Sequence, residues 1–386
     1  MAFDAREEQR EARVNSAGAN NMSMSRFGFI VHPLSASEDV GRKYPIARYL
    51  PERVVEWALM RTPAIMVSHI TGVAGYDGAR AEGWFVGCPL TPRQMLQLPT
   101  DYVIGRIIET GKLAEKTGAL IVGLGAFTSV VGDAGISIAR GLNIAVTTGN
   151  SYTVSTAVEG TLEAARLMGL DPAKSAAAVV GCTGSIGRVT SQILAEIVPH
   201  LVLVGRDEAR LRAVAEQASG GAQVETSTNA SQALLAADIV IAVTSAVDTV
   251  IEPSYLKPGA VVCDVARPRD VSKQVARERP DVLVIEGGVV GVPGEVDFGF
   301  DFGFPPRTAY ACMAETMLLA LEQRYESFSL GREIEAAKVK EITALAAKHG
   351  FRLAGFRSFE REVTPEQIAR AREHAERARK HGIAAV

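Results

Sequence analysis

Short apolar runs alternate with amphipathic stretches along most of the chain. The first half contains three strand-like apolar runs: FGFIVHPL from Phe27, AIMVSHITGV over 64–73, and ALIVGLG, which ends at Gly125. Helix-like stretches lie between them, around 51–60 and from about 101 to 117. Strands that alternate with helices in this way predict a layered α/β structure.

The second half repeats this alternation with sharper boundaries, after a turn at 169–172. AAAVVGCTGSIGRVTSQILAEIV has the pattern of a strand, a glycine-rich loop and a helix, and HLVLVGRDEARLRAVAEQA that of a strand and a helix. Three further apolar runs follow, ADIVIAVTSA, AVVCDVARP and VLVIEGGVV. Short strands alternating with helices at this spacing predict a doubly wound parallel sheet.

Composition is typical of a globular protein and argues against several classes. Hydrophobic residues make up 47% and charged residues 22% of the 386 residues, and the formal net charge of −3 argues against nucleic acid as a partner. The four cysteines form no CxxC pair, which argues against a metal site and fits a cytoplasmic protein. The most apolar window, 120–139, holds four glycines and Asp133, so we expect no transmembrane segment.

A glycine-rich loop follows the first strand of the second half and begins a helix. Glycines in such a loop permit a tight turn and close approach of a pyrophosphate, and the helix start offers unpaired N–H groups to its charge. The alternative is a tight strand–helix turn that binds no ligand. The residues expected to contact a dinucleotide are Gly181, Thr183, Gly184, Ser185, Ile186 and Gly187.

The end of the next strand indicates which nicotinamide nucleotide is bound. A protein that prefers NAD usually has an acidic residue there, whereas this chain has Arg206 followed by Asp207. Because a cation suits a 2′-phosphate, we predict NADPH. Thr244 and Ser245, at the end of IVIAVTS, are expected beside the nicotinamide half of the cofactor, unless they simply end the strand.

One cysteine raises a question of chemistry. Cys312 lies in YACMAETMLLAL, part of a helix predicted from Thr308 to about Tyr325 with a stripe of apolar residues. A free cysteine in such a helix is usually a buried apolar residue. Cys312 is, however, displaced from the stripe and close to the helix start, where a thiolate is stabilised. The carboxylate of Glu315, one turn later, would oppose that effect.

Several motifs together resemble those of one enzyme family. RTAYACMAETMLLALEQRYESFSLGR is similar to the C-terminal signature of the long-chain acyl-(acyl carrier protein) reductases, which form fatty aldehydes in cyanobacteria. FGFIVHPLS, GLGAFTSVV, TTGNSYT, GCTGSIG and KHGF resemble further pieces in the family's order, over roughly residues 27 to 351. The segment DFGFDFGFPPR departs from the family's pattern.

The resemblance implies NADPH-dependent reduction of a long-chain acyl thioester to a fatty aldehyde, with the acyl group held on Cys312 as a thioester. The implied donor is an acyl group on acyl carrier protein or coenzyme A, and an aldehyde-consuming enzyme is a further candidate partner. Negative charge develops on the acyl oxygen in such a reaction, so a hydrogen-bond donor is expected, with Asn150 the first candidate and Thr148 the second. His32 is either an acid/base or a turn histidine.

We therefore expect an α/β protein with an N-terminal substrate domain, a doubly wound Rossmann domain that binds NADPH, and a C-terminal helical segment. The expected regions are a flexible arm (1–26), an acyl-substrate domain (27–170), a Rossmann domain (171–306), helices that carry the nucleophile and pack back on the substrate domain (307–355), and a helical extension (356–386).

Two other functions are compatible with parts of this pattern. A shikimate-dehydrogenase-like, NADP-dependent alcohol dehydrogenase has the same two-domain plan, but gives the ACMAE run no purpose. A non-catalytic protein that binds NADPH or a protein partner is the second alternative.

Overall fold

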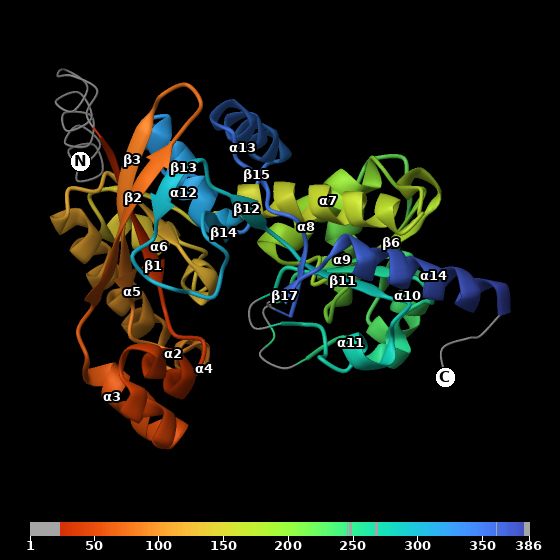
Figure 1. Ribbon diagram of the computed structural model, residues 1–386, viewed down its shortest axis with the longest axis horizontal. Helices are drawn as coiled ribbons and strands as arrows, with labels where there is room; N and C mark the ends of the chain where they lie inside the picture. The colour runs from red at the N-terminus through yellow and green to blue at the C-terminus, as the bar shows by residue number, and fades with distance from the viewer. Residues whose placement is uncertain (1–23, 245, 247–248, 267–268, 360, 382–386) are drawn as a thin grey trace. The chain divides into compact units, whose positions relative to one another are not determined.

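Two compact units make up the computed structural model, which describes residues 24–244, 246, 249–266, 269–359 and 361–381 (Figure 1). Each unit is assembled from segments far apart in the sequence. Of the arm expected over 1–26, Ser25 and Arg26 belong to the first strand, and 1–23 lie outside the described residues. The first unit comprises 1–149, 292–331 and 344–352, and the second comprises 150–291, 332–343 and 353–386.

The first unit is built on a six-stranded mixed sheet in the order β13-β2-β3-β1-β4-β5. Strands β3, β1, β4 and β5 run parallel, β2 is antiparallel to β3, and β13 is antiparallel to β2. Strands β1, β4 and β5 are largely buried, in agreement with their mainly apolar sequences. The strands are β1 (Ser25–Val31), β2 (Ile65–Ala74), β3 (Arg80–Gly87), β4 (Ile121–Leu124), β5 (Ala145–Thr147) and β13 (Gly294–Asp297).

Two helices cover opposite faces of this sheet, α5 (Thr100–Lys116) and α12 (Ala311–Leu321). Successive side chains of a strand point to opposite faces, so Gly28 faces α5 while its neighbour Phe29 faces α12. A Cβ on Gly28 would lie 2.6 Å from the Ala114 Cβ, and a Cβ on Gly123, the partner of Phe29, would lie 2.1 Å from the Thr316 hydroxyl. Glycines therefore let both helices approach the sheet closely.

Shorter helices complete the first unit. A capping box begins α4, where the Thr91 hydroxyl accepts from the Gln94 backbone and the Gln94 side chain accepts from the Thr91 backbone. These helices are α2 (Ala36–Lys43), η1 (Pro45–Tyr49), α3 (Glu52–Arg61), α4 (Pro92–Gln97), η2 (Ala126–Ser129) and α6 (Ile136–Gly141).

The helix predicted from Thr308 begins three residues later. Thr308–Tyr310 form the short strand β14, and α12 starts at Ala311. The reason is that Thr308–Tyr310 have an extended backbone, with φ of −66° and ψ of 146° at Tyr310, so the first helical turn begins after them. Farther along the chain lie α13 (Ala336–His349) and β15 (Arg352–Leu353).

The second unit has a six-stranded parallel sheet in the order β11-β10-β9-β6-β7-β8. From β6 the chain adds β7 and β8 on one side, then β9, β10 and β11 on the other, so the order reverses between β6 and β9. This is the strand order of doubly wound dinucleotide-binding folds, which bind ligands at the reversal point beyond the carboxyl ends of the strands. The predicted Rossmann architecture is confirmed.

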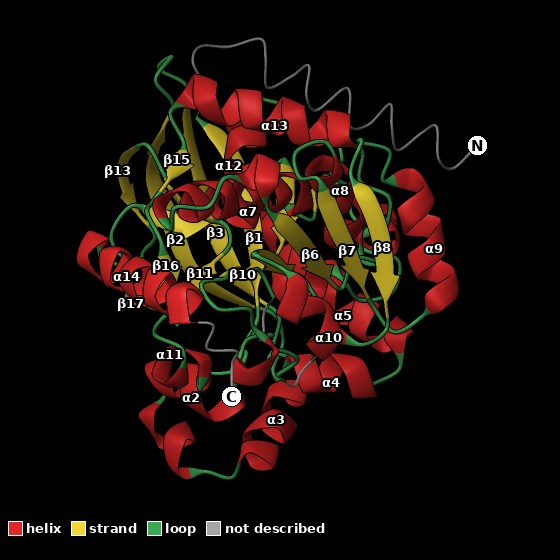
Figure 2. Cartoon of the chain, turned by 90° about the vertical axis from the view of Figure 1, so that its right-hand side faces the viewer, coloured by secondary structure: helices red, strands yellow, loops and turns green. Residues whose placement is uncertain are grey.

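Helices surround the strands of this sheet (Figure 2). The strands are β6 (Ala176–Val180), β7 (His200–Val204), β8 (Gln223–Ser227), β9 (Ile239–Ala242), β10 (Val261–Asp264) and β11 (Leu283–Glu286), with the short strands β12 (Val289–Gly291), β16 (Arg357–Ser358) and β17 (Arg361–Glu362) besides. The helices are α7 (Asn150–Leu167), η3 (Pro172–Lys174), α8 (Ser185–Ala195), α9 (Glu208–Gln217), α10 (Ala230–Ala236), η4 (Pro253–Tyr255), α11 (Val275–Glu278) and the predicted C-terminal helix α14 (Pro365–His381).

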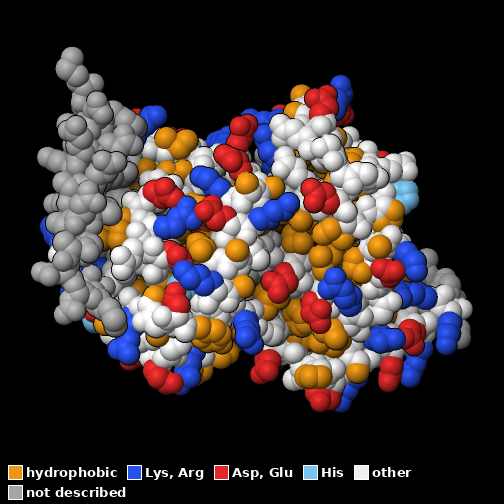
Figure 3. Space-filling model, turned by 90° about the horizontal axis from the view of Figure 1, so that it is seen from above, with side chains coloured by type: hydrophobic (Ala, Val, Ile, Leu, Met, Phe, Trp, Pro, Cys, Tyr) orange, Lys and Arg blue, Asp and Glu red, His pale blue; other side chains and the backbone are white. Residues whose placement is uncertain are grey.

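The surface and the helix lengths agree with the composition. Lysine and arginine side chains are interspersed with aspartate and glutamate on the face shown in Figure 3. Over the described residues, no helix combines the length and the apolar character needed to cross a membrane. The apolar window 120–139 instead contains β4, η2 and the start of α6.

Gly123→Ala should destabilise the protein by about 1–3 kcal/mol, because the added methyl would meet the Thr316 hydroxyl and the Phe29 ring on a packed face. Gly105→Ala is the matched control. Gly105 is exposed within α5 with open space around it, so alanine there should stabilise by about 0.5–1 kcal/mol. Urea denaturation measures both, and equal effects of the two changes would contradict the packing argument.

Candidate functional site

The glycine-rich loop lies at the reversal point of the second unit's sheet. Gly181 follows β6 with a φ of +84°, and a Cβ there would lie 3.0 Å from the backbone nitrogen of Thr244, which follows β9. A Cβ on Gly187 would lie 2.4 Å from the Gly181 carbonyl oxygen. Glycine is thus required at both positions, because backbone packs directly against backbone.

The start of α8 fits a diphosphate group. Its N-cap is Gly184, so no side chain caps the first N–H groups of the helix. A Cβ on Gly184 would have only the Gly181 carbonyl within 4 Å, at 3.4 Å, which leaves open space over the helix end. An anion is stabilised at such an uncapped N-terminus. The adjacent residues Thr183, Ser185 and Ile186 remain predicted contacts.

The residues after β7 are those expected to distinguish the two nicotinamide nucleotides. Asp207 is the N-cap of α9, where its carboxylate accepts from the Arg210 backbone at 3.1 Å and pairs with the Arg210 guanidinium at 3.6 Å. Arg206, one residue earlier, is exposed. The carboxylate is therefore engaged in its own helix while the guanidinium of Arg206 is exposed to solvent, an arrangement compatible with the predicted NADPH preference.

A buried carboxylate that the sequence did not reveal holds the loop after β9. Asp270 accepts from the backbone nitrogen of Thr244 at 2.9 Å and also from its hydroxyl. Burial raises the pKa of Asp270 to about 6, with a further contribution from Asp264, against the lowering effect of the Thr244 hydrogen bonds. Thr244 is thus fixed beside the reversal point, whereas Ser245 lies outside the described residues.

Asn150 begins α7 and is buried. Its side-chain amide donates to the Ser185 hydroxyl of the glycine-rich loop at 3.3 Å. Asn150 therefore links the start of α7 to the loop, an interaction that sequence alone did not indicate, and its role as a hydrogen-bond donor to substrate remains a prediction. Thr148, the second candidate, is buried and its hydroxyl donates to the Ser329 carbonyl.

Cys312 is the second residue of α12 and is partly exposed. Gly149 packs against it, since a Cβ on this glycine, whose φ is +73°, would lie 2.3 Å from the Cys312 Cα. The other three cysteines are buried, and burial raises the pKa of Cys88 to about 11 and that of Cys182 to about 12. Cys312 is thus the cysteine most accessible to a substrate.

Two polar residues anchor α12 to the first unit's sheet. Thr316, packed over Gly123, donates to the Cys312 carbonyl at 3.3 Å. Glu315 is fully buried and accepts a hydrogen bond from the hydroxyl of Thr147 at the end of β5. The Glu315 carboxylate therefore joins helix to strand, which gives it a structural purpose apart from any effect on the thiol.

His32 directly follows β1 and both of its ring nitrogens contact backbone groups. Nε2 accepts from the Phe127 N–H at 3.1 Å, so the proton is assigned to Nδ1, which lies 3.1 Å from the Pro33 carbonyl. Burial lowers the pKa of His32, and the Pro33 hydrogen bond and Asp39 only partly offset it. This geometry favours the turn-histidine interpretation over an acid/base role.

A chain of aromatic rings leads to the residue before α12. Ring centroids lie 6.2 Å apart for Phe29–Phe85, 6.1 Å for Phe85–Phe298, 5.1 Å for Phe298–Phe302, 5.3 Å for Phe302–Phe304 and 4.5 Å for Phe304–Tyr310. Tyr310 is the N-cap of the cysteine helix. These aromatic rings thus form an apolar wall from the sheet to the candidate nucleophile.

A tandem repeat in the sequence builds most of this wall. DFGFDFGF, residues 297–304, contains the unit DFGF twice, and each aspartate accepts from the glycine N–H two residues later at 2.8 Å. Gly299 and Gly303 have φ of +61° and +86°, which glycine adopts readily. The repeat was visible in the sequence as a departure from the family pattern, and its internal symmetry was the signal that could have revealed its role.

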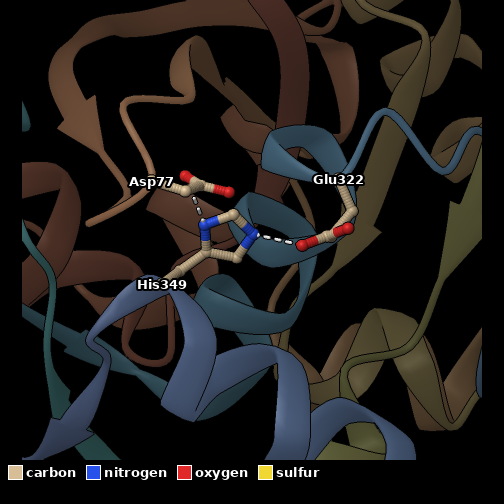
Figure 4. A group of neighbouring side chains, drawn as sticks. All are labelled: Asp77, Glu322 and His349. Atoms are coloured by element: carbon tan, nitrogen blue, oxygen red, sulfur yellow. Dashed lines mark hydrogen bonds and ion pairs between the residues drawn. The ribbon is translucent and has the colours of Figure 1, made fainter.

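Among the described residues, one cluster of side chains has the residue types of a metal site: Asp77, Glu322 and His349, whose ligand atoms lie within 4.8 Å of one another (Figure 4). The imidazole, however, lies between the two carboxylates, with Nδ1 3.3 Å from Asp77 and Nε2 2.6 Å from Glu322. The Lys348 ammonium is 2.5 Å from Glu322 and 3.6 Å from Asp77, so a cation of the protein already pairs with both acids. The cluster is best described as an ion-pair network.

Comparison with known proteins supports a nicotinamide-dependent enzyme. Residues 163–286, within the second unit, match the sequence profile of the shikimate/quinate 5-dehydrogenase family. The long-chain acyl-[acyl-carrier-protein] reductase of Synechococcus elongatus is 28% identical over 342 residues, which are 84% of this chain and 98% of that protein. With the strand order of the second unit, these similarities support an oxidoreductase that binds a nicotinamide nucleotide.

Two further similarities say less about function. Aminotransferase PigE of a Serratia strain is 30% identical over 359 residues, which cover 89% of this chain, but the chain spans only 41% of that protein's length. L-tryptophan dehydrogenase from Nostoc punctiforme shares 12% identity over 92% of this chain and 89% of its own, with a TM-score of 0.41. That structural similarity is too weak to indicate a function.

Glu322→Ala should lower the free energy of unfolding at pH 7 by about 1–3 kcal/mol, because the buried His349 would lose its Nε2 partner. Burial raises the pKa of Glu322 less than Lys348 and His349 lower it, so its folded-state pKa is below the ordinary 4.5. The carboxylate's contribution is therefore present above pH 4.5 and lost as the pH falls through the lowered value.

Urea denaturation of wild type and variant at several pH values measures this effect. Glu295→Ala is the control, since Glu295 is 84% exposed in its pair with Arg307 and should contribute about 1 kcal/mol or less. The prediction is wrong if the two variants lose the same stability at pH 7, or if the loss in Glu322→Ala persists unchanged at the lowest pH.

Proposed function

We propose that this protein uses NADPH to reduce a long-chain acyl thioester to a fatty aldehyde, through an acyl-enzyme on Cys312. The observation that carries the proposal is the accessibility of Cys312 at the start of α12, in a chain whose other three cysteines are buried. Similarity to a long-chain acyl-[acyl-carrier-protein] reductase over 84% of the chain supports the substrate class. The donor is an acyl group on acyl carrier protein or coenzyme A.

The first step is attack of the Cys312 thiolate on the thioester carbonyl. A bond forms between the sulfur and the acyl carbon, and the donor's thiolate leaves and takes up a proton. The start of α12 stabilises the attacking thiolate through the helix dipole, and no acidic residue lies in the helix's first turn. The rings of Phe304 and Tyr310 offer an apolar surface to the alkyl chain.

Both steps of the reaction place negative charge on the acyl oxygen, which needs a preorganised donor. Asn150 is the first candidate, since it is buried and directly follows Gly149, whose backbone packs against Cys312. Thr148 is a weaker candidate because its hydroxyl already donates to the Ser329 carbonyl. Loss of one such donor typically lowers the rate by about 10²–10³.

The residues at the reversal point of the second unit fit NADPH. The uncapped start of α8 suits the diphosphate, and Arg206 suits a 2′-phosphate. The bound nicotinamide supplies the hydride that reduces the acyl carbonyl. Collapse of the tetrahedral intermediate then releases the aldehyde and restores the Cys312 thiolate. Overall, the acyl thioester, NADPH and a proton give the aldehyde, the free thiol and NADP⁺.

The alternative of a shikimate-dehydrogenase-like alcohol dehydrogenase is less well supported. The profile of that family matches only 163–286, the part of the chain that contains the nucleotide-binding sheet. A match confined to this region bears on the cofactor and leaves the substrate open. The accessible Cys312 has no function in alcohol oxidation of that kind, so we favour the thioester reductase.

Cys312→Ser should lower aldehyde formation by about 10³-fold or more, because the covalent step is lost. Binding of NADPH, measured by fluorescence titration, should stay near wild type. Wild-type protein incubated with acyl donor but no NADPH should gain the mass of one acyl group at Cys312, detected by peptide mass spectrometry. Cys88→Ala, which changes a buried thiol, should retain the adduct. A variant without Cys312 that still forms aldehyde at the wild-type rate would refute the covalent assignment.

Arg206→Ala should lower kcat/KM for NADPH about tenfold or more while kcat/KM for NADH changes little, because a charged hydrogen bond to the 2′-phosphate is lost. Arg212→Ala is the matched control, since Arg212 is another exposed arginine that pairs with Glu208 on α9. Steady-state assays with both nucleotides measure the ratio. Equal or better use of NADH by wild type would overturn the cofactor preference.

A further inference from the structure

The first unit exposes an apolar surface on η1 and α3 that no described part of the chain covers. Ile46 is 70% exposed, Tyr49 87% and Trp57 55%, and Tyr44 and Val54 are also exposed. A small core of Ala36, Ala47 and Val55 supports the surface from within. Large apolar side chains gathered in this way on a folded surface mark a site of interaction.

The acidic side chains of this segment point inward, whereas its arginines are exposed. Glu52 points inward, where its carboxylate accepts from the backbone of Ala36 at 2.6 Å and of Ser37 at 3.1 Å. Glu56 is buried and binds Thr91 and Arg93. The arginines of the segment, in contrast, are exposed: Arg48, Arg53 and Arg61. Over 44–61 the surface therefore presents cations and apolar groups without an exposed acid.

The cations lie among the apolar groups on α3. Arg53, Trp57 and Arg61 follow one another at intervals of four, so they share one face of the helix. The Arg61 guanidinium lies 3.9 Å from the Trp57 ring centroid. A helix that inserts into a bilayer surface has its cations on the face opposite the apolar residues. The interleaved pattern instead suits a protein that offers carboxylates next to apolar side chains.

Within the first unit, this surface lies toward the same edge of the sheet as Cys312. Strands β1, β4 and β5 are parallel, so their carboxyl ends share one edge of the sheet. The turn after β5 packs against Cys312 through Gly149, and the chain after β1 leads directly into α2 and α3. In Figure 1, α2 and α3 project beyond this end of the strands.

We propose that the surface formed by η1 and α3 is the docking site for the acyl carrier protein that delivers the thioester. The inference rests on the proposed function, because the partner is the donor's own carrier. Carrier proteins of this kind are acidic, so their carboxylates complement the exposed arginines and speed encounter. Docking at this edge presents the acyl group on the side of the sheet where Cys312 lies.

The test compares two donors that carry the same acyl chain, palmitoyl-acyl carrier protein and palmitoyl-coenzyme A. Arg48→Glu combined with Arg53→Glu should lower kcat/KM for the carrier-protein donor about tenfold or more at low ionic strength and leave the coenzyme A donor within twofold. Trp57→Ala should have the same selectivity. Arg80→Glu is the control, because Arg80 is exposed at the start of β3, on the opposite edge of the sheet, and should affect neither donor.

Direct binding separates this proposal from the proposed function. Fluorescence anisotropy with labelled holo-acyl carrier protein should show binding to wild type, loss in the double variant and retention in Arg80→Glu, whether or not aldehyde is formed. If wild type reduces neither donor but binds the carrier through these arginines, the reaction is wrong and the docking site stands. If the carrier donor is used equally well by all variants, the docking site is wrong and the reaction stands.

Two further outcomes would overturn the docking site. Equal losses with both donors would show that the changes act on the reaction itself. Binding of wild type to vesicles of phosphatidylcholine and phosphatidylglycerol, lost in the double variant while carrier-protein kinetics stay unchanged, would assign the surface to a membrane.

Discussion

Close packing of α12 against β4 and the turn after β5 is the constraint on which the candidate site depends. Gly123 lets Thr316 approach β4, and Gly149 lets the turn after β5 lie against Cys312. Glu315 adds a buried hydrogen bond to Thr147 at the same strand. Because side chains larger than hydrogen are excluded at both glycines, the distance between the start of α12 and the strands is fixed.

The alternation of apolar strands and amphipathic helices was enough to predict the α/β class and the parallel Rossmann sheet, since both are local patterns with strong periodicity. The capping box of Thr91 and Gln94 at α4 is likewise a local pattern, since it depends on two residue types three positions apart. The start of α12 was not predicted, because the extended conformation of Thr308–Tyr310 leaves no mark in the apolar periodicity of the segment. The division of the C-terminal part of the chain between two units depends on long-range packing that periodicity does not record.

The residues of the candidate site were likewise predicted only in part from the sequence. The glycine-rich loop and Cys312 were found from the sequence because their chemistry depends on residue type and local position. Asp270 and Glu315 were not assigned their partners, since each becomes significant only through a hydrogen bond to a residue distant in the chain. For His32 the sequence left two roles open, and the contacts with Phe127 and Pro33 favour the structural one.

The tandem DFGF segment has a consequence for how its neighbourhood tolerates change. Each DFGF repeat closes its own turn with its own aspartate, so the geometry of one turn does not depend on the other. The rings are nevertheless linked, because Phe298 contacts Phe302 and Phe302 contacts Phe304. The segment is therefore modular in its backbone and continuous in its side chains: a change in one turn stays local, whereas loss of the Phe302 ring would remove its contacts with three other rings, those of Phe85, Phe298 and Phe304.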